Sequence, residues 1–293
     1  MRTRTMLAVW MAAALTLGAC GAPAAEEATS PAADEIEVPA EAPAEPTAAM
    51  PEATEADAEA DAHAAPHWAY EGEEGPDNWG EIDASYATCA SGAEQSPIDL
   101  TGATTEDLTN IAFHYQPGGA RIFNNGHTIE VEFPDTAGSF IEVDGHRYDL
   151  KQFHFHTPSE HTFDGRAAAA ELHLVHKDAD DKLAVVGVML DEGDASAALA
   201  PVWDHLPAVE APDASDNIDA VDAAALLPAE QATYRYSGSL TTPPCTEGVS
   251  WFVMTTPMTL SGDQLAAFTA IVEGNNRPVQ DLGARDLDLD TTP

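Results

Sequence analysis

Histidine spacing in residues 152–176 constrains the fold most, because five of the eleven histidines fall in this short stretch. Side chains two positions apart in a β-strand share one face of the sheet. In "QFHFH", His154 and His156 therefore point the same way, and in "ELHLVH", Glu171 and His173 do so. Two neighbouring strands of this kind would bring three imidazoles together and leave one tetrahedral position open. That is the ligand arrangement of a catalytic zinc site.

A single HxH pair is more often polar strand surface than a metal site, so the third histidine decides this interpretation. Gln152 lies on the face of His154, and Glu171 lies on the face of His173. Each can accept the second N–H of a metal-bound imidazole and so fix its tautomer. The alternative is that both are solvated strand residues. Leucines at the alternating positions make the other face apolar, which favours the supporting role for Glu171.

Short runs of alternating hydrophobic residues continue on both sides of this stretch, between Ile111 and Leu190. Turn sequences such as "NNG", "VDG" and "DADDK" separate them, and strands with short connections pair antiparallel. Helical periodicity is confined to pieces such as "ASAALAPVWDHL" and "SGDQLAAFTAIVE". We predict a mainly β (α+β) single domain, with a large, mostly antiparallel twisted central sheet and a few short peripheral helices.

Residues 1–20 have the pattern of an export signal, with Arg2 and Arg4 before an apolar run. The run ends in "LGAC", which resembles a bacterial lipobox and predicts cleavage before Cys20 and lipid attachment to its thiol. Gly21 follows, whereas an inner-membrane retention signal usually has Asp there, so an outer-membrane anchor facing the periplasm or the cell surface is expected. The alternative is ordinary signal cleavage nearby that leaves Cys20 unmodified.

Composition divides the rest of the chain. Residues 21–66 hold 12 acidic residues, no basic ones and almost no large apolar side chains, so we predict a disordered acidic Ala/Glu/Pro tether. Residues 67–293 are long enough for one sizeable core and form the predicted catalytic domain. Within it, residues 283–293, "GARDLDLDTTP", are expected to be a frayed acidic tail.

Net charge limits the partners. Without the two arginines of the signal and the 12 acidic residues of the tether, 9 basic and 39 acidic residues remain, a net charge of −30. This charge argues against nucleic acid and against an anionic lipid surface as partners. We therefore expect contact with a membrane only through the lipid anchor at Cys20. A neutral small substrate would be little affected by the field.

Two cysteines remain in the domain, Cys89 and Cys245. Exported compartments permit disulfides, and a bridge between positions so far apart would constrain the unfolded chain substantially. The alternative is a pair of buried free thiols, which fits the cytosol better than an exported protein.

Several separated motifs resemble the α-class carbonic anhydrases, over essentially residues 67–282. They occur in order along the chain: "QSPIDL" at 95–100, "NNGHT" at 124–128, "QFHFH" with "SEH" at 152–161, "AELHLVH" at 170–176, "GSLTTPPC" at 238–245 and "NNRPVQ" at 275–280. The positions of Cys89 and Cys245 are similar to those of exported bacterial members, which have one disulfide there. Such members often form dimers, so the resemblance also suggests a homodimer.

The resemblance implies one catalytic Zn²⁺ held by His154, His156 and His173. Zinc-bound water loses a proton near neutral pH, a mechanism for which carbonic anhydrase is itself the standard example, and the hydroxide adds to carbon dioxide to give bicarbonate and a proton. Thr241 matches the residue that accepts a hydrogen bond from this hydroxide and donates one to Glu160. Thr242 matches a residue beside the bound anion.

Carbon dioxide is apolar, and the resemblance implies an apolar substrate pocket beside the metal. Individually its members would be interpreted as ordinary core residues, and only the matched motifs assign them to the pocket. They are Val175, Val185, Leu240, Val249 and Trp251.

The resemblance also implies a proton shuttle at His127, with Tyr70 and Asn125 ordering water between it and the metal. Histidine titrates near neutral pH, which suits this role. Glu130 departs from the family pattern, which has a neutral amide at this position, and a carboxylate there would raise the pKa of the shuttle. The remaining domain histidines that we considered are assigned structural or surface roles: His114, His146, His161, His176 and His205.

Two other functions were weighed against the enzyme. A catalytically inactive member of the same fold could serve as a binding or adhesion module, but the ligand histidines, Thr241 and Glu160 are all present. Ester hydrolysis is a conceivable side activity of the same nucleophile. The sequence does not choose among carbon dioxide supply, pH control and bicarbonate handling as the physiological role.

Overall fold

The computed structural model describes residues 66–211, 215–272 and 274–292. The predicted signal peptide, Cys20 and all but the last residue of the predicted tether lie outside these ranges. In the described part, no helix is both long enough and apolar enough to cross a membrane.

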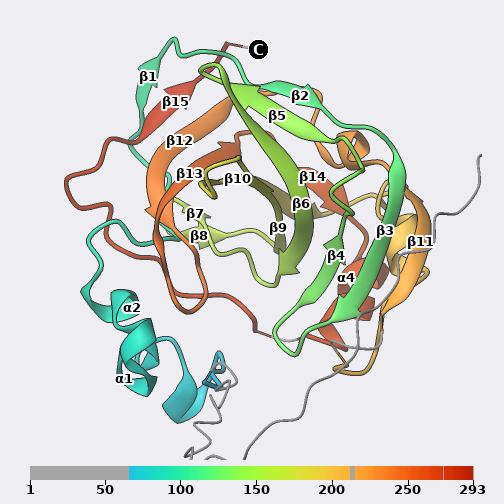
Figure 1. Cartoon of the computed structure of the whole chain (residues 1–293), viewed down its shortest axis with the longest axis horizontal. Coiled ribbons are helices and arrows are strands. Elements are labelled where there is room, and N and C mark those ends of the chain that lie inside the picture. Colours follow the sequence, from blue (N-terminus) through green and yellow to red (C-terminus); the bar gives the residue numbers. More distant parts are fainter. Residues whose placement is uncertain (1–65, 212–214, 273, 293) are drawn as a thin grey trace, which may run out of the picture. The chain divides into compact units, whose positions relative to one another are not determined.

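One large sheet dominates the described part of the chain (Figure 1). It contains 13 strands, ten of which follow the order β1-β15-β12-β13-β10-β9-β6-β4-β3-β11, while β14 pairs with β10, and β5 pairs with β2 and β6. The strands are β1 (Thr104–Glu106), β2 (Ala112–His114), β3 (Gly118–Asn124), β4 (Ile129–Glu132), β5 (Phe140–Val143), β6 (His146–His156), β9 (Ala170–Lys177), β10 (Leu183–Glu192), β11 (Asp216–Val221), β12 (Thr233–Ser239), β13 (Glu247–Met254), β14 (Met258–Leu260) and β15 (Asp288–Asp290). The predicted fold class, a mainly β domain with a large and mostly antiparallel sheet, is confirmed.

A separate hairpin and several short helices complete the described elements. The hairpin consists of β7 (Thr162–Phe163) and β8 (Arg166–Ala167). The helices are η1 (Gly72–Glu74), α1 (Trp79–Ile82), η2 (Ala84–Tyr86), α2 (Thr88–Ser91), α3 (Ala200–Trp203), η3 (Ala223–Leu226) and α4 (Gly262–Thr269). α4 begins with a capping box in which Ser261 accepts from the backbone of Gln264, and it lies in the segment "SGDQLAAFTAIVE" for which helical periodicity was noted. The helices before β1 were not predicted, because each has at most four residues and shows no periodicity.

The turn between β5 and β6 explains why β6, the strand that holds His154 and His156, begins at His146. Asp144 and Gly145 both have positive φ angles, 53° and 74°. Such a two-residue connection matches the twist of the flanking strands, and Asp-Gly is a favoured sequence for it. The turn "VDG" therefore sets the register of β6 against β5, with Val143 opposite His146.

The sheet also contains parallel pairs, which the sequence did not predict. β10 pairs in parallel with β13 and with β14, and β1 pairs in parallel with β15. Parallel neighbouring strands require long connections, so no short turn sequence between them indicates the pairing. These pairs join segments far apart in the chain and place β13 next to β10, which in turn pairs with the histidine-bearing strand β9.

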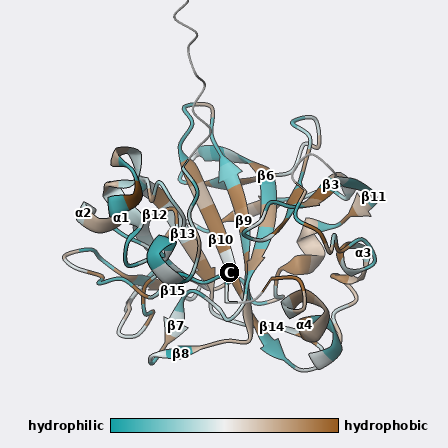
Figure 2. Ribbon diagram, turned by 90° about the horizontal axis from the view of Figure 1, so that it is seen from below, coloured by the Kyte–Doolittle hydropathy of each residue, from teal (hydrophilic) through white to brown (hydrophobic). Residues whose placement is uncertain are grey.

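Hydrophobic side chains fill both sides of the central strands. One large cluster includes Leu172 and Leu174, and a smaller cluster includes Val185, Val249 and Trp251. Figure 2 shows hydrophobic residues along central strands such as β10. β9 is buried on both faces from Ala170 to Leu174, which is typical of a central strand.

The C-terminal segment differs from the predicted frayed tail. Residues 288–290 form β15, which pairs with β1 and β12. Leu287 is buried, and the buried Asp290 accepts a hydrogen bond from Arg235, with Nη2 and Oδ2 2.5 Å apart. The prediction of fraying over 283–293 was thus wrong for these residues, because a buried ion pair and a strand pairing hold an acidic sequence in the sheet.

The disulfide between Cys89 and Cys245 is confirmed, with the two Cα atoms 5.0 Å apart. It connects α2 to the loop that follows β12. Gln95 reinforces the same connection, since its amide nitrogen donates to the Cys245 carbonyl over 3.1 Å. The loop that contains Thr241 and Thr242 is therefore fixed to the N-terminal helices.

Candidate metal centre

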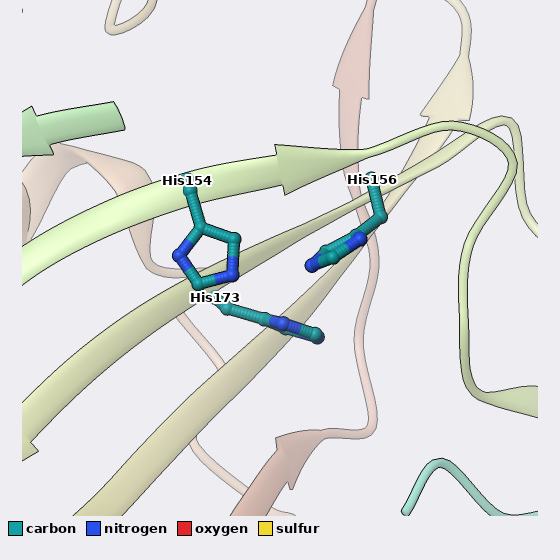
Figure 3. A group of neighbouring side chains, drawn as sticks. All are labelled: His154, His156 and His173. Atoms are coloured by element: carbon teal, nitrogen blue, oxygen red, sulfur yellow. The ribbon is translucent and has the colours of Figure 1, made fainter. Parts of the chain in front are cut away.

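Three histidines meet where β6 and β9 run side by side (Figure 3). The antiparallel register places His154 opposite His173, and His156 opposite Glu171. One ligand nitrogen from each imidazole lies within 4.8 Å of the other two. The strand period thus brings together the three side chains that the sequence selected.

Two of the imidazoles are held by side chains on the same strand. His154 Nδ1 lies 2.8 Å from Gln152 Oε1, and His173 Nε2 lies 3.0 Å from Glu171 Oε1. Each ring therefore donates one N–H to an oxygen acceptor and leaves its other nitrogen without a proton. The free nitrogens are Nε2 of His154 and Nδ1 of His173. The structure places Gln152 and Glu171 where the strand period predicted them.

The third imidazole is held by the backbone. His156 Nδ1 lies 2.6 Å from the carbonyl oxygen of Asn275, more than a hundred residues away in sequence. The Asn275 side chain holds the same region: Oδ1 accepts from the backbone N–H of Thr157, and Nδ2 donates to the carbonyls of Phe155 and His127. This role of Asn275 was not predicted, and the motif "NNRPVQ" is its only signal in the sequence.

The donor set fits a zinc ion. His156 Nε2 is buried and has no hydrogen-bond partner in the described residues, which is costly unless something else binds it. Burial lowers the pKa of all three imidazoles, to about 4 for His156 and well below the usual range for His154. They are therefore neutral at physiological pH, the form that binds metal. Three neutral imidazole nitrogens suit zinc, with one position left open.

Glu171 links this centre to a second buried histidine. Its Oε1 accepts from His161 Nδ1 at 2.7 Å as well as from His173, and its Oε2 accepts from the backbone N–H groups of Glu160 and His161. Burial alone would raise the pKa of Glu171, but the two histidines hold it well below its usual value. Glu171 is therefore a carboxylate, and it fixes both rings.

The buried chain of hydrogen bonds continues beyond His161. Its Nε2 lies 2.6 Å from the Tyr236 hydroxyl, which lies 2.9 Å from Ser96 Oγ. His176 is held in a similar way, with Nε2 2.7 Å from the Tyr115 hydroxyl. These two histidines thus have the structural roles that the sequence analysis assigned to them.

Glu160 lies beside the free nitrogens. Its Oε2 is 3.5 Å from His156 Nε2 and 3.9 Å from His173 Nδ1, and its Oε1 accepts from the backbone N–H of Arg277 at 2.8 Å. Burial raises the pKa of Glu160 to about 7, against the lowering effects of His173, of the Arg277 backbone and of a hydrogen bond from the Thr241 side chain. The predicted pair of Thr241 and Glu160 therefore lies together at the metal centre.

Arg277 is a second residue that the sequence analysis missed. Its guanidinium is buried and donates to Gln95 Oε1 and to the carbonyls of Ser96 and Cys89 at 2.8–2.9 Å. These contacts fix the backbone that supports both His156 and Glu160. A buried arginine bound mainly to carbonyl oxygens gives no pattern in the sequence.

The predicted apolar wall is assembled in one hydrophobic cluster. Its buried members are Val185, Val249 and Trp251, and Val175 and Leu240 pack against them. The Trp251 ring lies 4.9 Å from the His173 ring, measured between centroids. An apolar surface therefore adjoins the metal ligands. Thr242 is half-buried in the following loop, where its carbonyl accepts from the Cys245 N–H.

His127 lies in the turn after β3 and is partly exposed. Its ring stacks on Trp68, with centroids 3.6 Å apart and planes 7° from parallel. Burial and the nearby His67 lower the pKa of His127, while Glu210 raises it. Asn125 fixes the turn, because its Oδ1 accepts the backbone N–H of His127 at 2.9 Å.

Tyr70 lies close to the buried carboxyl of the centre. Burial, followed by the charge of Glu160, raises the pKa of the Tyr70 hydroxyl well above its usual value, so the hydroxyl keeps its proton. The Trp68 ring contacts Tyr70 edge-on at 5.3 Å. This contact joins Tyr70 to the tryptophan beneath His127, an arrangement that the sequence analysis did not foresee.

Comparisons with known proteins agree with this geometry. Residues 74–289 match the family described as eukaryotic-type carbonic anhydrase. The carbonic anhydrase of Klebsiella pneumoniae is 44% identical over 222 residues, which is 75% of this chain and 90% of that protein. The structure of the α-carbonic anhydrase from Thermovibrio ammonificans with sulfanilamide has a TM-score of 0.73 and 40% identity, and the match covers 77% of this chain and all of that one.

A third similar protein has a different name. The crystal structure of dioscorin complexed with ascorbate has a TM-score of 0.73 and 34% identity, and the match covers 78% of this chain and 99% of that one. Proteins with different names therefore share this fold. Together with the family match over most of the domain, these similarities establish that the chain belongs to the carbonic anhydrase family of the eukaryotic, or α, type.

Proposed function

We propose that the protein catalyses the zinc-dependent, reversible hydration of carbon dioxide to bicarbonate and a proton. One observation above all supports this proposal. Three neutral imidazoles each donate one N–H to a fixed acceptor, and their remaining nitrogens lie within 4.8 Å of one another. Such a set holds one metal ion and leaves a position for water.

His154, His156 and His173 would hold the ion. A zinc ion bound there lowers the pKa of a coordinated water to near neutrality, which supplies the nucleophile. Thr241 and Glu160 orient this nucleophile. The Thr241 hydroxyl donates a hydrogen bond to the carboxylate of Glu160, so the Thr241 oxygen can only accept a hydrogen bond from the nucleophile. A ligand that cannot donate a proton to Thr241 is disfavoured there.

Carbon dioxide would lie against the apolar wall of Val185, Val249 and Trp251, beside His173. Transfer of an apolar molecule from water to such a surface is favourable in free energy. Transfer of charged bicarbonate to the same surface is unfavourable, because the surface offers its charge little solvation. This difference favours substrate entry and product departure. Thr242 would face the side on which the anion is released.

The proton released in each cycle would leave through His127. A neutral imidazole accepts the proton and passes it to solvent, which its partial exposure permits. The turn that contains His127 is fixed by Asn125, and its ring rests on Trp68. Tyr70 and Asn125 would order the intervening water.

A catalytically inactive binding module is the second candidate, because a protein with a different name, dioscorin in complex with ascorbate, shares the fold. The complete imidazole set and the Thr241 and Glu160 pair favour the enzyme. Stopped-flow measurement of carbon dioxide hydration tests the choice directly, with the native protein, after chelation and after zinc is returned. Activity lost on chelation and restored by zinc is expected. A folded, zinc-loaded protein without activity would instead support the binding module.

We further propose that the protein is exported and anchored by lipid at Cys20. The lipobox-like sequence supports this, and the Cys89–Cys245 disulfide suits an oxidising compartment. Mass spectrometry of the mature N-terminus tests it: a diacylglycerol-modified Cys20 is expected, and an unmodified Cys20 or a different first residue would contradict the anchor. The homodimer stays a prediction, which light scattering can check.

A further inference from the structure

Glu130 is an unusual residue beside the metal centre. It lies on β4, directly opposite His154 of β6 in an antiparallel pair. Side chains of such a pair lie on the same face of the sheet with their Cβ atoms about 4.5–5.5 Å apart. Glu130 therefore shares the face that holds the three imidazoles.

The Glu130 carboxylate is fixed at the His127 turn. Asn125 Nδ2 donates to Glu130 Oε2 at 3.2 Å, while Asn125 Oδ1 accepts the N–H groups of His127 and Thr128 at 2.9 and 2.8 Å. One amide thus connects the carboxylate to the turn that presents His127. Glu130 is half-buried, so its charge is only partly screened by solvent.

Glu132, two positions along the same strand, provides a contrast. Its Oε2 lies 2.5 Å from Arg121 Nη2, so that its charge is balanced within an ion pair. Within the described ranges, no lysine, arginine or histidine nitrogen makes an ion pair with Glu130. Glu132 and Arg121 are the charged groups that influence it most among its neighbours, and their effects oppose each other.

A second carboxylate lies close to the same turn. A β-carbon added to Gly126 would lie only 2.7 Å from Glu210 Oε1. Glu210 also raises the pKa of His127 by its charge. Two acidic side chains therefore lie close to the turn, of which Glu130 lies on the strand adjoining the ligands.

The negative charge of Glu130, which has no ion-pair partner in the described residues, affects the binding of carbon dioxide and of bicarbonate differently. Carbon dioxide is neutral and has no net Coulomb interaction with Glu130. A monovalent anion at the metal is repelled, and at roughly 8 Å in a partly hydrated site this corresponds to a loss of affinity of about three- to tenfold. The repulsion should weaken as salt is added.

We propose that Glu130 is a specificity-determining residue, whose carboxylate weakens the binding of small anions, bicarbonate and inorganic inhibitors alike, at the metal centre. The inference rests on the proposed function, because it assumes that anions bind at the open metal position. It goes beyond that function because it assigns the low affinity of the metal centre for small anions to one residue.

Thiocyanate binding to the cobalt(II)-substituted full-length protein provides the test, with visible absorption as the readout. Because burial and Glu132 raise the pKa of Glu130, the titration is run at about pH 8, where the carboxylate is ionised. Glu130→Gln should bind thiocyanate about three- to tenfold more tightly than the native protein, and the gain should shrink at higher ionic strength. Glu130→Asp, which keeps the charge, and Glu132→Gln, whose charge is already paired, should bind it nearly as the native protein does.

Equal affinity of Glu130→Gln and native protein, with both folded and cobalt-loaded, would overturn the proposal. The same gain in Glu132→Gln would also overturn it, because general net charge would then explain the effect. Hydration is measured separately on the zinc form. A native protein that binds cobalt and thiocyanate but hydrates no carbon dioxide refutes the proposed function alone, whereas absent cobalt binding refutes both.

Discussion

The two faces of β9 hold residues that are equally buried but are stabilised in different ways. Leu174 and Glu171 are both 0% exposed, on opposite faces of the strand. Leu174 is surrounded by hydrophobic side chains, whereas Glu171 accepts four hydrogen bonds. The apolar face gains stability from the area removed from water, and the polar face avoids a large cost only because its groups are paired.

The difference explains where the chemistry lies. On the polar face, pairing is complete around Glu171 but incomplete at His156 Nε2 and Glu160 Oε2, which are buried and have no partner in the described residues. Unpaired buried groups are costly, and they persist where a ligand completes them. A substitution on the apolar face should therefore change stability, and one on the polar face should change metal binding and turnover.

His173→Ala should have the largest effect. It removes one of three ligands and the ring that packs on Trp251, so hydration activity should fall by about a thousandfold or more. Stopped-flow hydration and zinc content by atomic absorption measure the two losses. His114→Ala, at an exposed histidine on β2, is the control and should retain both. A fully active His173→Ala protein would show that the ligand set is wrong.

Leu174→Ala should affect stability instead. Deleting a fully buried leucine side chain costs about 2–5 kcal/mol of unfolding free energy. Urea unfolding of the metal-free protein measures the loss, and Val279→Ala, at an exposed position, should change it by less than about 0.5 kcal/mol. The zinc content of Leu174→Ala should stay near one ion per chain. A loss of zinc without a loss of stability would contradict the division between the two faces.

Glu171→Gln tests the polar face without removing a ligand. An amide keeps the size of the side chain but has one acceptor oxygen in place of two and no charge, so it cannot accept from both rings and from both backbone N–H groups. The orientation of the His173 ring is therefore weakened. Zinc affinity or activity should fall by about ten- to a hundredfold. Competition with a chromophoric chelator measures the affinity. Glu142→Gln, an exposed residue of β5, should bind zinc as the native protein does, and an equal loss in both variants would argue against orientation by Glu171.

The smallest effect is expected at Asp99, a polar group outside both faces. Although burial raises its pKa, hydrogen bonds from Thr101, Thr162 and Gly165 lower it to about 2. Because the folded pKa lies below the unfolded one, Asp99 stabilises the fold above about pH 4, and this contribution is lost as the pH falls toward 2. Between about pH 4 and pH 2, the unfolding free energy of Asp99→Asn, measured by urea unfolding, should therefore fall less than that of the native protein. Parallel curves would contradict the assignment.

Local periodicity accounts for what the sequence could predict of the site. His154, His156 and His173, together with Gln152 and Glu171, follow from residues two apart on paired strands. The Asp144–Gly145 turn and the capping box of α4 are likewise encoded by adjacent residues. In each case the determining interactions lie within a few positions of one another or across one antiparallel pair.

Contacts over long separations account for what was missed. The acceptor for His156 is a backbone carbonyl at Asn275, and every residue has a carbonyl, so composition gives no sign of it. Arg277 supports the same segment through carbonyl oxygens. The acidic C-terminal residues joined the sheet because Arg235 pairs with Asp290, a contact between strands that charge counting cannot locate.

Anomalous diffraction from a zinc-loaded crystal would identify the metal ligands directly. We expect one zinc peak at full occupancy, about 2.0–2.1 Å from Nε2 of His154, Nε2 of His156 and Nδ1 of His173. The hydrogen bonds to Gln152, Asn275 and Glu171 should stay on the opposite nitrogens. A zinc peak bound by other residues, or by the nitrogens that now donate to these acceptors, would contradict it.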